Sequence, residues 1–281
     1  MSNNEIIAKF EIKNDNSRER IINSYESMEE NRDLWYRANM EDPSIDNAGE
    51  IQRCEIYINN EKINFSYIYL FKTKGNYIIK YKFKDLMRST CFMFCDCPSL
   101  VSIDFSNFDT KNVIDMRYMF SYCFSLETIN LSNFNTNKVK DMRFMFNDCL
   151  SLKSLDISNI NTQNVRSMDF IFYCCESLTS LDLSNFNNQS LIDMSHMFSC
   201  CVSLKYLNLT NFKTPNVKDM EYMFNNCKSL ISLDLSSFNT ENVIIMNYMF
   251  NYCCSLISLD LSNFNIQNVT DMSELFSYCT S

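Results

Sequence analysis

One pair of residues recurs at a fixed interval, and this interval constrains the fold more than any other feature of the chain. Met, Ile or Leu followed by Phe stands every 26 residues. The pairs are Met93-Phe94, Met119-Phe120, Met145-Phe146, Ile171-Phe172, Met197-Phe198, Met223-Phe224, Met249-Phe250 and Leu275-Phe276. A cysteine follows three residues after each Phe, from Cys97 to Cys279. A strict period in this range is typical of a stacked solenoid, in which each coil buries its apolar face against its neighbours.

Residues 113–138 illustrate one coil. Apolar residues recur with helical spacing in its first half, at Val113, Met116, Met119, Phe120 and Cys123. Asn112 and Asp115 have the spacing of an N-cap and the carboxylate three residues after it, so we expect a short helix or a run of helical turns. The pattern Leu-x-x-Ile-x-Leu that follows the cysteine predicts a strand. Strands of successive coils should stack in parallel ~4.8 Å apart.

The repeat unit resembles a known family. The unit reads Met-x-x-Met-Phe-x-x-Cys-x-Ser-Leu-x-x-Leu-Asp-Leu-Ser-Asn-Phe-Asn-Thr-x-Asn-Val-x-Asp and appears almost verbatim at residues 220–245 and 246–271. It is similar to the BspA-like leucine-rich repeat family of bacterial and protist surface proteins, over roughly residues 92–281. The resemblance implies a leucine-rich-repeat solenoid used for adhesion or protein binding, and it implies no catalytic residues.

Residues 1–90 do not follow the period, and we expect a small, mostly β domain there. Alternating apolar residues predict a strand at Ile6–Ile12 and a β-meander from Cys54 to Phe83, with a hairpin turn at Lys74-Gly75-Asn76. The polar stretch 31–50, which contains Trp35, predicts a long loop with a turn of helix. Because no linker separates this domain from the first coil, we expect it to cap the solenoid; a separate binding module is the alternative.

The expected fold class is therefore an α/β repeat: a leucine-rich-repeat solenoid with one parallel sheet. Residues 91–281 would form about seven and a half coils behind the cap. No polar cap follows Cys279-Thr280-Ser281. Three interpretations stay open: the last repeat closes the stack, this end self-associates with another molecule, or the sequence is a fragment.

Composition narrows the class of partner and the compartment. The formal net charge of −9 argues against a nucleic-acid partner, because nucleic acids require a basic patch. No run of ~18 apolar residues indicates a transmembrane segment. The first ten residues show neither a basic region nor a long apolar stretch, so we expect a cytoplasmic protein. The alternative is the cell surface, or secretion by a non-standard route.

The chain has 14 cysteines, and their spacing argues against a disulfide scaffold. One cysteine of each repeat falls in a single core column, so we expect a ladder of buried, reduced and inert thiols. The tandem pairs Cys174-Cys175, Cys200-Cys201 and Cys253-Cys254 each add a cysteine outside that column. These additional thiols are expected nearer the surface and more reactive.

A stripe of polar residues marks the strand position between the two inward apolar residues. Its members are Asp104, Asn130, Asp156, Asp182, Asn208, Asp234 and Asp260. Three interpretations of this stripe stay open. Each side chain could bond locally to the adjoining turn, or the stripe could bind a basic partner surface. It could also hold a row of calcium ions, although each ion needs six or more oxygens. Exposed positions that vary between repeats are candidates for specific recognition. These candidates are Glu127, Lys153, Lys205 and Tyr206.

The sequence gives little support for catalysis or metal binding. The only histidine, His196, replaces an aromatic residue of the repeat. A pair with Cys200 would still need an orienting group and an oxyanion site. Cys91, Cys95 and Cys97 have no second cluster at a spacing typical of zinc sites. We expect no enzymatic activity, cofactor or metal.

The predicted function is non-catalytic protein binding on the parallel-sheet face. A surface adhesin or structural spacer that binds extracellular protein is the alternative. A cysteine-rich metal or redox protein is a third.

Overall fold

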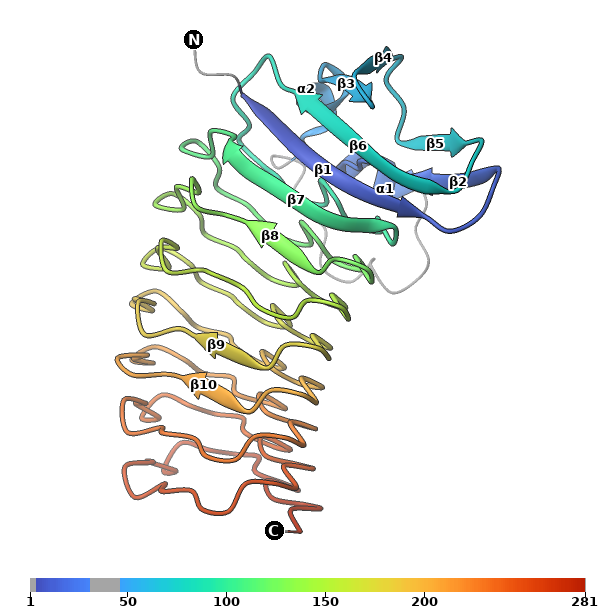
Figure 1. Ribbon diagram of the computed structural model, residues 1–281. Coiled ribbons are helices and arrows are strands. Elements are labelled where there is room, and N and C mark those ends of the chain that lie inside the picture. The colour runs from blue at the N-terminus through green and yellow to red at the C-terminus, as the bar shows by residue number, and fades with distance from the viewer. Residues whose placement is uncertain (1–3, 31–45, 281) are drawn as a thin grey trace.

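The structure is a computed structural model that describes residues 4–30 and 46–280. Successive coils stack into an elongated solenoid that extends from a β-rich module at its amino-terminal end (Figure 1). Parallel bridges join neighbouring coils at one repeated position. This position runs through Ser89, Asp115, Asp141, Ser167, Asp193, Asp219, Ile245 and Asp271. The stack of coils predicted from the 26-residue period is therefore present.

The amino-terminal module combines short helices with strands. In chain order its elements are β1 (Glu5–Ile12), β2 (Ser17–Arg20), α1 (Tyr25–Glu30), α2 (Ala48–Gln52), β3 (Glu55–Ile58), β4 (Glu61–Ile63), β5 (Ile68–Phe71) and β6 (Gly75–Lys82). The strand predicted at Ile6–Ile12 is β1. The expected loop lies mostly outside the described residues, as does Trp35.

The hairpin turn predicted at Lys74-Gly75-Asn76 is wrong. β5 pairs with β2, where Ser17 lies opposite Phe71, while β6 lies between β1 and β3 in the main sheet. Gly75 begins β6 with a φ of 144°, which glycine adopts readily and other residues do not. Alternating apolar residues predict that a segment is a strand, but they do not specify which strand it pairs with.

The strand half of the coils is less regular than expected. In the described repeats, strands form at β7 (Leu100–Asn107), β8 (Thr128–Asn130), β9 (Ser180–Asp182) and β10 (Tyr206–Asn208). β7 pairs in parallel with β8, and β9 with β10, but β7 also pairs antiparallel with β1. The main sheet therefore has the mixed order β4-β3-β6-β1-β7-β8, which corrects the expectation of one parallel sheet.

The turn half of the coils is not helical, which corrects the expected α/β repeat. The N–H of Met119 donates to the C=O of Met116 within its own turn at 3.4 Å. The N–H of Tyr118 instead donates to the C=O of Arg143 in the next coil at 3.0 Å. This alternation runs along the turn half, so every second donor joins two coils and the expected N-caps have no helix to cap. Because successive tight turns bury the same positions as a helix face, the apolar spacing did not separate the two structures.

Two long columns of stacked rings run through the solenoid, beside a shorter one formed by Phe186, Phe212 and Phe238. The inner column consists of the Phe from the recurring pair of each repeat, Phe94 to Phe276, with neighbouring ring centroids 5.4–6.1 Å apart. The outer column runs from Phe92 through Tyr118 and His196 to Tyr248, with centroids 4.2–4.7 Å apart. Each outer member has a φ above +50°, which is uncommon for a bulky residue. Stacking against a ring in each neighbouring coil stabilises this backbone conformation.

The module and the coils share one buried core. A single hydrophobic cluster extends from Ile6 in β1 to Cys253 in a late coil. Two buried amides add polar links across the same junction. Asn23 Nδ2 donates to the C=O of Cys95 at 3.0 Å, and Asn47 Nδ2 donates to the C=O of Cys91 at 2.8 Å. The domain boundary at residue 90 stays a prediction, because the core is continuous across it.

Candidate functional site

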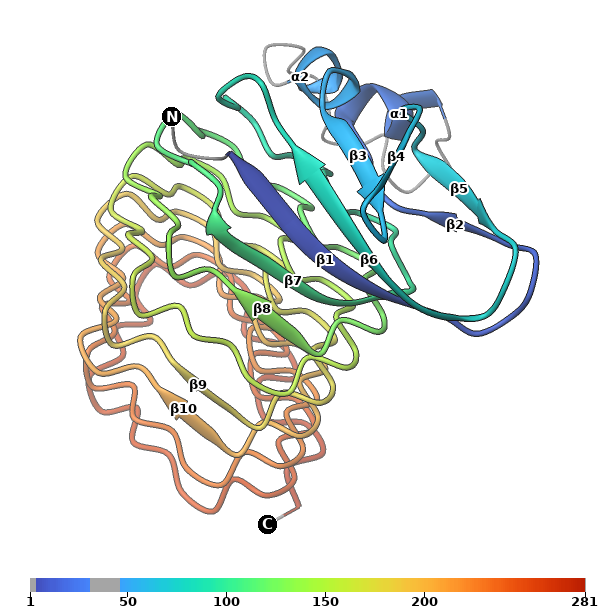
Figure 2. The same ribbon diagram turned by 45° about the horizontal axis from the view of Figure 1, so that its top comes forward.

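The outward side of the strands carries a shallow depression of about 700 Å³. It spans four neighbouring coils and includes β9 and β10, which lie side by side on the same side of the solenoid as β8 (Figure 2). Its polar members are Ser154, Asp156, Ser180, Asp182, Tyr206, Asn208, Ser232 and Asp234. Five of the residues singled out in the sequence therefore line one surface.

Each stripe side chain accepts a hydrogen bond from the backbone two residues further on. Asp156 Oδ1 accepts from the N–H of Ser158 at 3.0 Å. The same bond recurs at Asp104, Asn130, Asp182, Asn208, Asp234 and Asp260. The bonds define Asx turns, so the expected local bonding is present. The backbone N–H and then the hydroxyl of Ser158 also lower the pKa of Asp156, which keeps this carboxylate ionised and fixed in orientation.

Two asparagines interrupt the column of carboxylates. Asn130 Nδ2 donates to Asp104 Oδ1 at 2.9 Å. Asn208 adds to the bonds from Ser184 that lower the pKa of Asp182. Like charges directly opposite each other destabilise neighbouring strands, and an amide between them reduces that repulsion. The stripe is therefore acidic without a carboxylate in every coil.

The variable candidates occupy two kinds of surroundings. Lys153 Nζ lies 3.0 Å from Glu127 Oε2, so these two side chains pair across neighbouring coils. Lys205 is exposed, and Tyr206, with 64% of its surface exposed, lines the depression. Tyr206 stands where the flanking coils have Ser180 and Ser232. The structure thus brings Tyr206 together with the stripe but not with the Glu127–Lys153 pair.

The residues considered for catalysis and zinc lie in packed surroundings. The His196 ring stacks between Phe170, at 4.2 Å, and Tyr222, at 4.7 Å, and burial lowers its pKa to about 4. Cys91, Cys95 and Cys97 are fully buried, and burial raises their pKa values well above the ordinary thiol value. Within residues 4–30 and 46–280, no group of three His, Cys, Asp or Glu side chains is placed to hold a metal ion.

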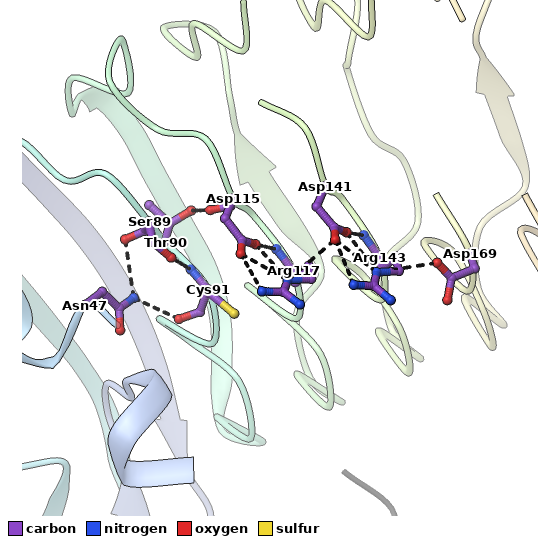
Figure 3. A network of polar contacts seen from close by, with 9 residues as sticks. All are labelled: Asn47, Ser89, Thr90, Cys91, Asp115, Arg117, Asp141, Arg143 and Asp169. Atoms are coloured by element: carbon purple, nitrogen blue, oxygen red, sulfur yellow. Dashed lines mark hydrogen bonds and ion pairs between the residues drawn. The ribbon is translucent and has the colours of Figure 1, made fainter. Parts of the chain in front are cut away.

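Sequence reasoning missed a second polar column, which lies in the turn half. Figure 3 shows Asp115 and Arg117 in one coil and Asp141 and Arg143 in the next. Arg117 Nη2 lies 2.7 Å from Asp115 Oδ2, and its Nε lies 3.6 Å from Asp141 Oδ2. Arg143 Nη2 lies 2.9 Å from Asp141 Oδ2, and its Nε lies 3.8 Å from Asp169 Oδ1. Each arginine therefore bridges two coils.

Burial and ion pairing have opposite effects on the pKa of the arginines in this column. Burial opposes the charge on Arg117, but its hydrogen bonds to Asp115 outweigh that effect and raise the pKa of Arg117. The sequence pattern that could have predicted these ion pairs is Asp-x-Arg at the same repeat position in two consecutive coils. It was not recognised because Asp115 was interpreted as part of a helix cap.

The same column lacks arginine further along the stack. Ser195 and Glu221 occupy the repeat position of the two arginines. Burial, with the charge of Asp193 adding to it, raises the pKa of Asp169 to about 7 and that of Asp219 to about 6. Burial therefore makes the carboxyl groups of Asp169 and Asp219 easier to protonate than that of an ordinary Asp.

Comparison with known proteins adds a family and one solved structure. A crystal structure of a leucine-rich repeat protein from Bacteroides ovatus ATCC 8483 is similar to the chain, with 20% identity and a TM-score of 0.41. The similarity covers 69% of this chain and 44% of the other, so the chain spans less than half of that protein's length. Comparison with the curated proteins gives no match. In the part of the chain that the structure describes, no helix is both long and apolar enough to cross a bilayer.

A family model matches the coils. Its description is "Mycoplasma protein of unknown function, DUF285", and it matches residues 88–208 and 193–281. These ranges begin at the first bridged coil and together include most of the chain. The protein therefore belongs to the DUF285 family.

Proposed function

We propose that the protein is a non-catalytic interaction module that binds a basic segment of a protein partner on the strand face. The observation that carries this proposal is the depression around Tyr206. There Asp156, Asp182 and Asp234 are fixed by Asx turns beside the exposed aromatic ring. Interfaces are enriched in Tyr, whose ring supplies large contact area.

The chemistry of the depression favours Lys or Arg on the partner. Carboxylates with fixed orientation accept charge-assisted hydrogen bonds from ammonium or guanidinium groups. The face of the Tyr206 ring can also hold a cation. Serines from the flanking coils, Ser180 and Ser232, supply neutral hydrogen-bonding groups at the same level.

The first test removes charge while keeping the backbone. In the variant Asp156→Asn/Asp182→Asn/Asp234→Asn, each amide can hold the same turn, as Asn130 and Asn208 do. We expect the affinity for a fluorescent Lys-rich peptide, measured by anisotropy, to fall about 10–100-fold, because each exposed charge contact contributes on the order of 0.5–1 kcal/mol.

A matched control removes three carboxylates elsewhere. Glu61→Gln/Glu176→Gln/Glu241→Gln changes the net charge equally at exposed residues that do not line the depression. Tyr206→Ser copies the flanking coils and should also weaken binding. Equal affinity loss in the control and in the stripe variant would show that net charge alone attracts the peptide, and would refute the site.

We assign the amino-terminal module a capping role, supported by the pairing of β1 with β7 at the end of the stack. We also propose a cytoplasmic location. Fractionation of the source cell distinguishes it from the surface location that a BspA-like adhesin or spacer would need. Self-association through the last coil is tested by light scattering.

A further inference from the structure

One position of the turn half holds cysteines in two neighbouring coils. Cys174 and Cys200 directly precede the column cysteines Cys175 and Cys201. In the other described coils the same position holds Asp96, Tyr122, Asp148, Asn226, Tyr252 and Tyr278. The third additional cysteine, Cys254, has no such neighbour. It follows its column cysteine, and the same repeat position holds Lys228 in the preceding coil and Thr280 in the following one.

The backbone holds Cys174 and Cys200 side by side. The N–H of Cys174 donates to the C=O of Ser199 in the next coil at 2.9 Å, so the two cysteines are neighbours across the ladder. Both have left-handed φ values, 55° and 62°, so the two cysteines share the same unusual backbone conformation at the same repeat position. Backbones ~4.8 Å apart fall within the Cα separation of about 4.4–6.8 Å that disulfides span.

The surroundings favour a thiolate on Cys200. The interaction between the two thiols raises the pKa of Cys174 and lowers that of Cys200. Asn226 Nδ2 lies 3.5 Å from this sulfur, and Ser199 Oγ lies 3.9 Å from it. The interaction with Cys174, followed by the hydrogen bonds from Asn226 and Ser199, lowers the pKa of Cys200 to about 6 despite partial burial. A thiolate is the nucleophilic form of cysteine.

Access separates this pair from the column thiols. Cys174 and Cys200 are half-buried, whereas Cys175 and Cys201 are fully buried. Burial raises the pKa of Cys175 and Cys201, which keeps them protonated and unreactive. The two classes of thiol therefore differ in both exposure and ionisation, although they are adjacent in sequence.

We propose that Cys200 and Cys174 form a hydroperoxide-sensitive pair that closes into a disulfide between two coils. The Cys200 thiolate attacks one oxygen of the hydroperoxide, so that an S–O bond forms, the O–O bond breaks and hydroxide or alkoxide leaves. Cys200 becomes a sulfenic acid. The sulfur of Cys174 then attacks that of Cys200, so that the S–S bond forms and the S–O bond breaks. The departing hydroxide takes the proton of Cys174 as water.

The step balances without a further reagent. Two thiols lose two electrons and two protons, and one hydroperoxide is reduced to water plus water or alcohol. The bond would link residues 26 positions apart and fix the spacing of two coils at one point. This inference rests on the turn half alone and is independent of the binding proposed for the strand face.

The test exposes the fully reduced chain to about one equivalent of hydrogen peroxide, followed by alkylation and peptide mapping. Cleavage must occur at acidic residues, such as Asp182 and Asp193, because no Lys or Arg lies between the two cysteines. Fragment spectra distinguish Cys174 and Cys200 from Cys175 and Cys201. We expect a Cys174–Cys200 disulfide as the main product, with Cys254 alkylated as before treatment.

Two variants separate the roles. Cys200→Asn and Cys174→Asn place at each site the residue that Asn226 supplies in the next coil, and asparagine tolerates left-handed φ. Cys200→Asn should leave Cys174 reduced, while Cys174→Asn should leave a sulfenic acid on Cys200 that dimedone traps; Cys254→Ser should change neither result. Oxidation of Cys254 to the same extent as Cys200, or no dimedone adduct in a folded Cys174→Asn variant, would overturn the proposal.

Discussion

The thiol of Cys149 donates a hydrogen bond to the backbone C=O of Phe120, one coil earlier, at 3.3 Å. The same carbonyl accepts the N–H of Cys123, so both of its lone pairs are used. The thiol bond recurs along the column, from Cys123 to Cys279. The cysteine of each repeat is therefore a buried donor between coils as well as a small apolar residue.

Removing one of these donors should cost stability. Cys149→Ala deletes the donor and leaves a small cavity, so we expect the free energy of unfolding to fall by about 1–3 kcal/mol. Cys254→Ala is the control for a thiol outside the core: its hydrogen bonds to the C=O groups of Tyr252 and Tyr278 are exposed to water, and surface changes are usually within about 0.5 kcal/mol. Urea denaturation followed by circular dichroism measures both, and equal losses would argue against the donor role.

Asp169 should make the folded state less stable as pH rises. Burial raises its pKa to about 7, above the ~3.9 of an unfolded Asp. The folded state holds the proton more tightly, so the stabilisation is complete below pH ~4 and is lost as pH rises through ~7. We expect Asp169→Asn to raise the free energy of unfolding by about 1–3 kcal/mol at pH 7 and to change it little at pH 4. In urea titrations across this range, Asp156→Asn should show no such gain.

His196 should make the folded state less stable as pH falls, the opposite of the effect expected for Asp169. Burial lowers its pKa to about 4, below the ~6.5 of an unfolded His, so its contribution is complete above pH ~6.5 and is lost as pH falls towards 4. His196→Tyr introduces the residue found at Tyr222 and Tyr248 and keeps the ring stack. We expect this variant to melt at a higher temperature than the parent at pH 4.5, with a smaller difference at pH 7.5. A constant difference across pH would contradict the assignment.

Removing one partner of the Asp115–Arg117 ion pair should lower the free energy of unfolding more than removing both. Arg117→Met leaves the Asp115 carboxylate buried without its cation, which we expect to cost about 3–5 kcal/mol. Asp115→Ser/Arg117→Ser places at both positions the residue that Ser167 and Ser195 supply in other coils, so it should cost less than the single change. The single variants Asp115→Ser and Arg117→Ser complete a double-mutant cycle with the double variant, and their urea midpoints give the coupling energy. A double variant less stable than Arg117→Met would refute the expectation.

Periodicity was informative because it reports burial, which repeats from coil to coil. The spacing of Phe94, Phe120 and Cys123 was sufficient to predict a stack of coils with these residues inside. It was insufficient to distinguish a helix from tight turns, because that choice depends on whether the N–H of Tyr118 bonds within its coil or to the next. Pairing between β5 and β2 likewise depends on distant segments.

The candidate site was predictable in part. Repetition of Asp at alternating strand positions placed Asp156 and Asp182 on the outward face, and the Ser two residues on predicted their local bonds. The depression around Tyr206 is formed by residues from four neighbouring coils, so it could not be predicted from any single repeat. The pairing of Cys174 with Cys200 needed the register between coils and the left-handed backbone, since neither shows in the one-dimensional spacing.

Every second N–H of the turn half donates to the coil that follows. A coil can therefore be followed by any segment that presents the same acceptors in the same order. Insertion or deletion of 26 residues would leave all columns aligned, whereas a shift by one residue would misalign the ring stacks, the thiols and the charges together. A change in length that keeps the stack intact must therefore add or remove a whole coil, which lengthens or shortens the strand face by ~4.8 Å.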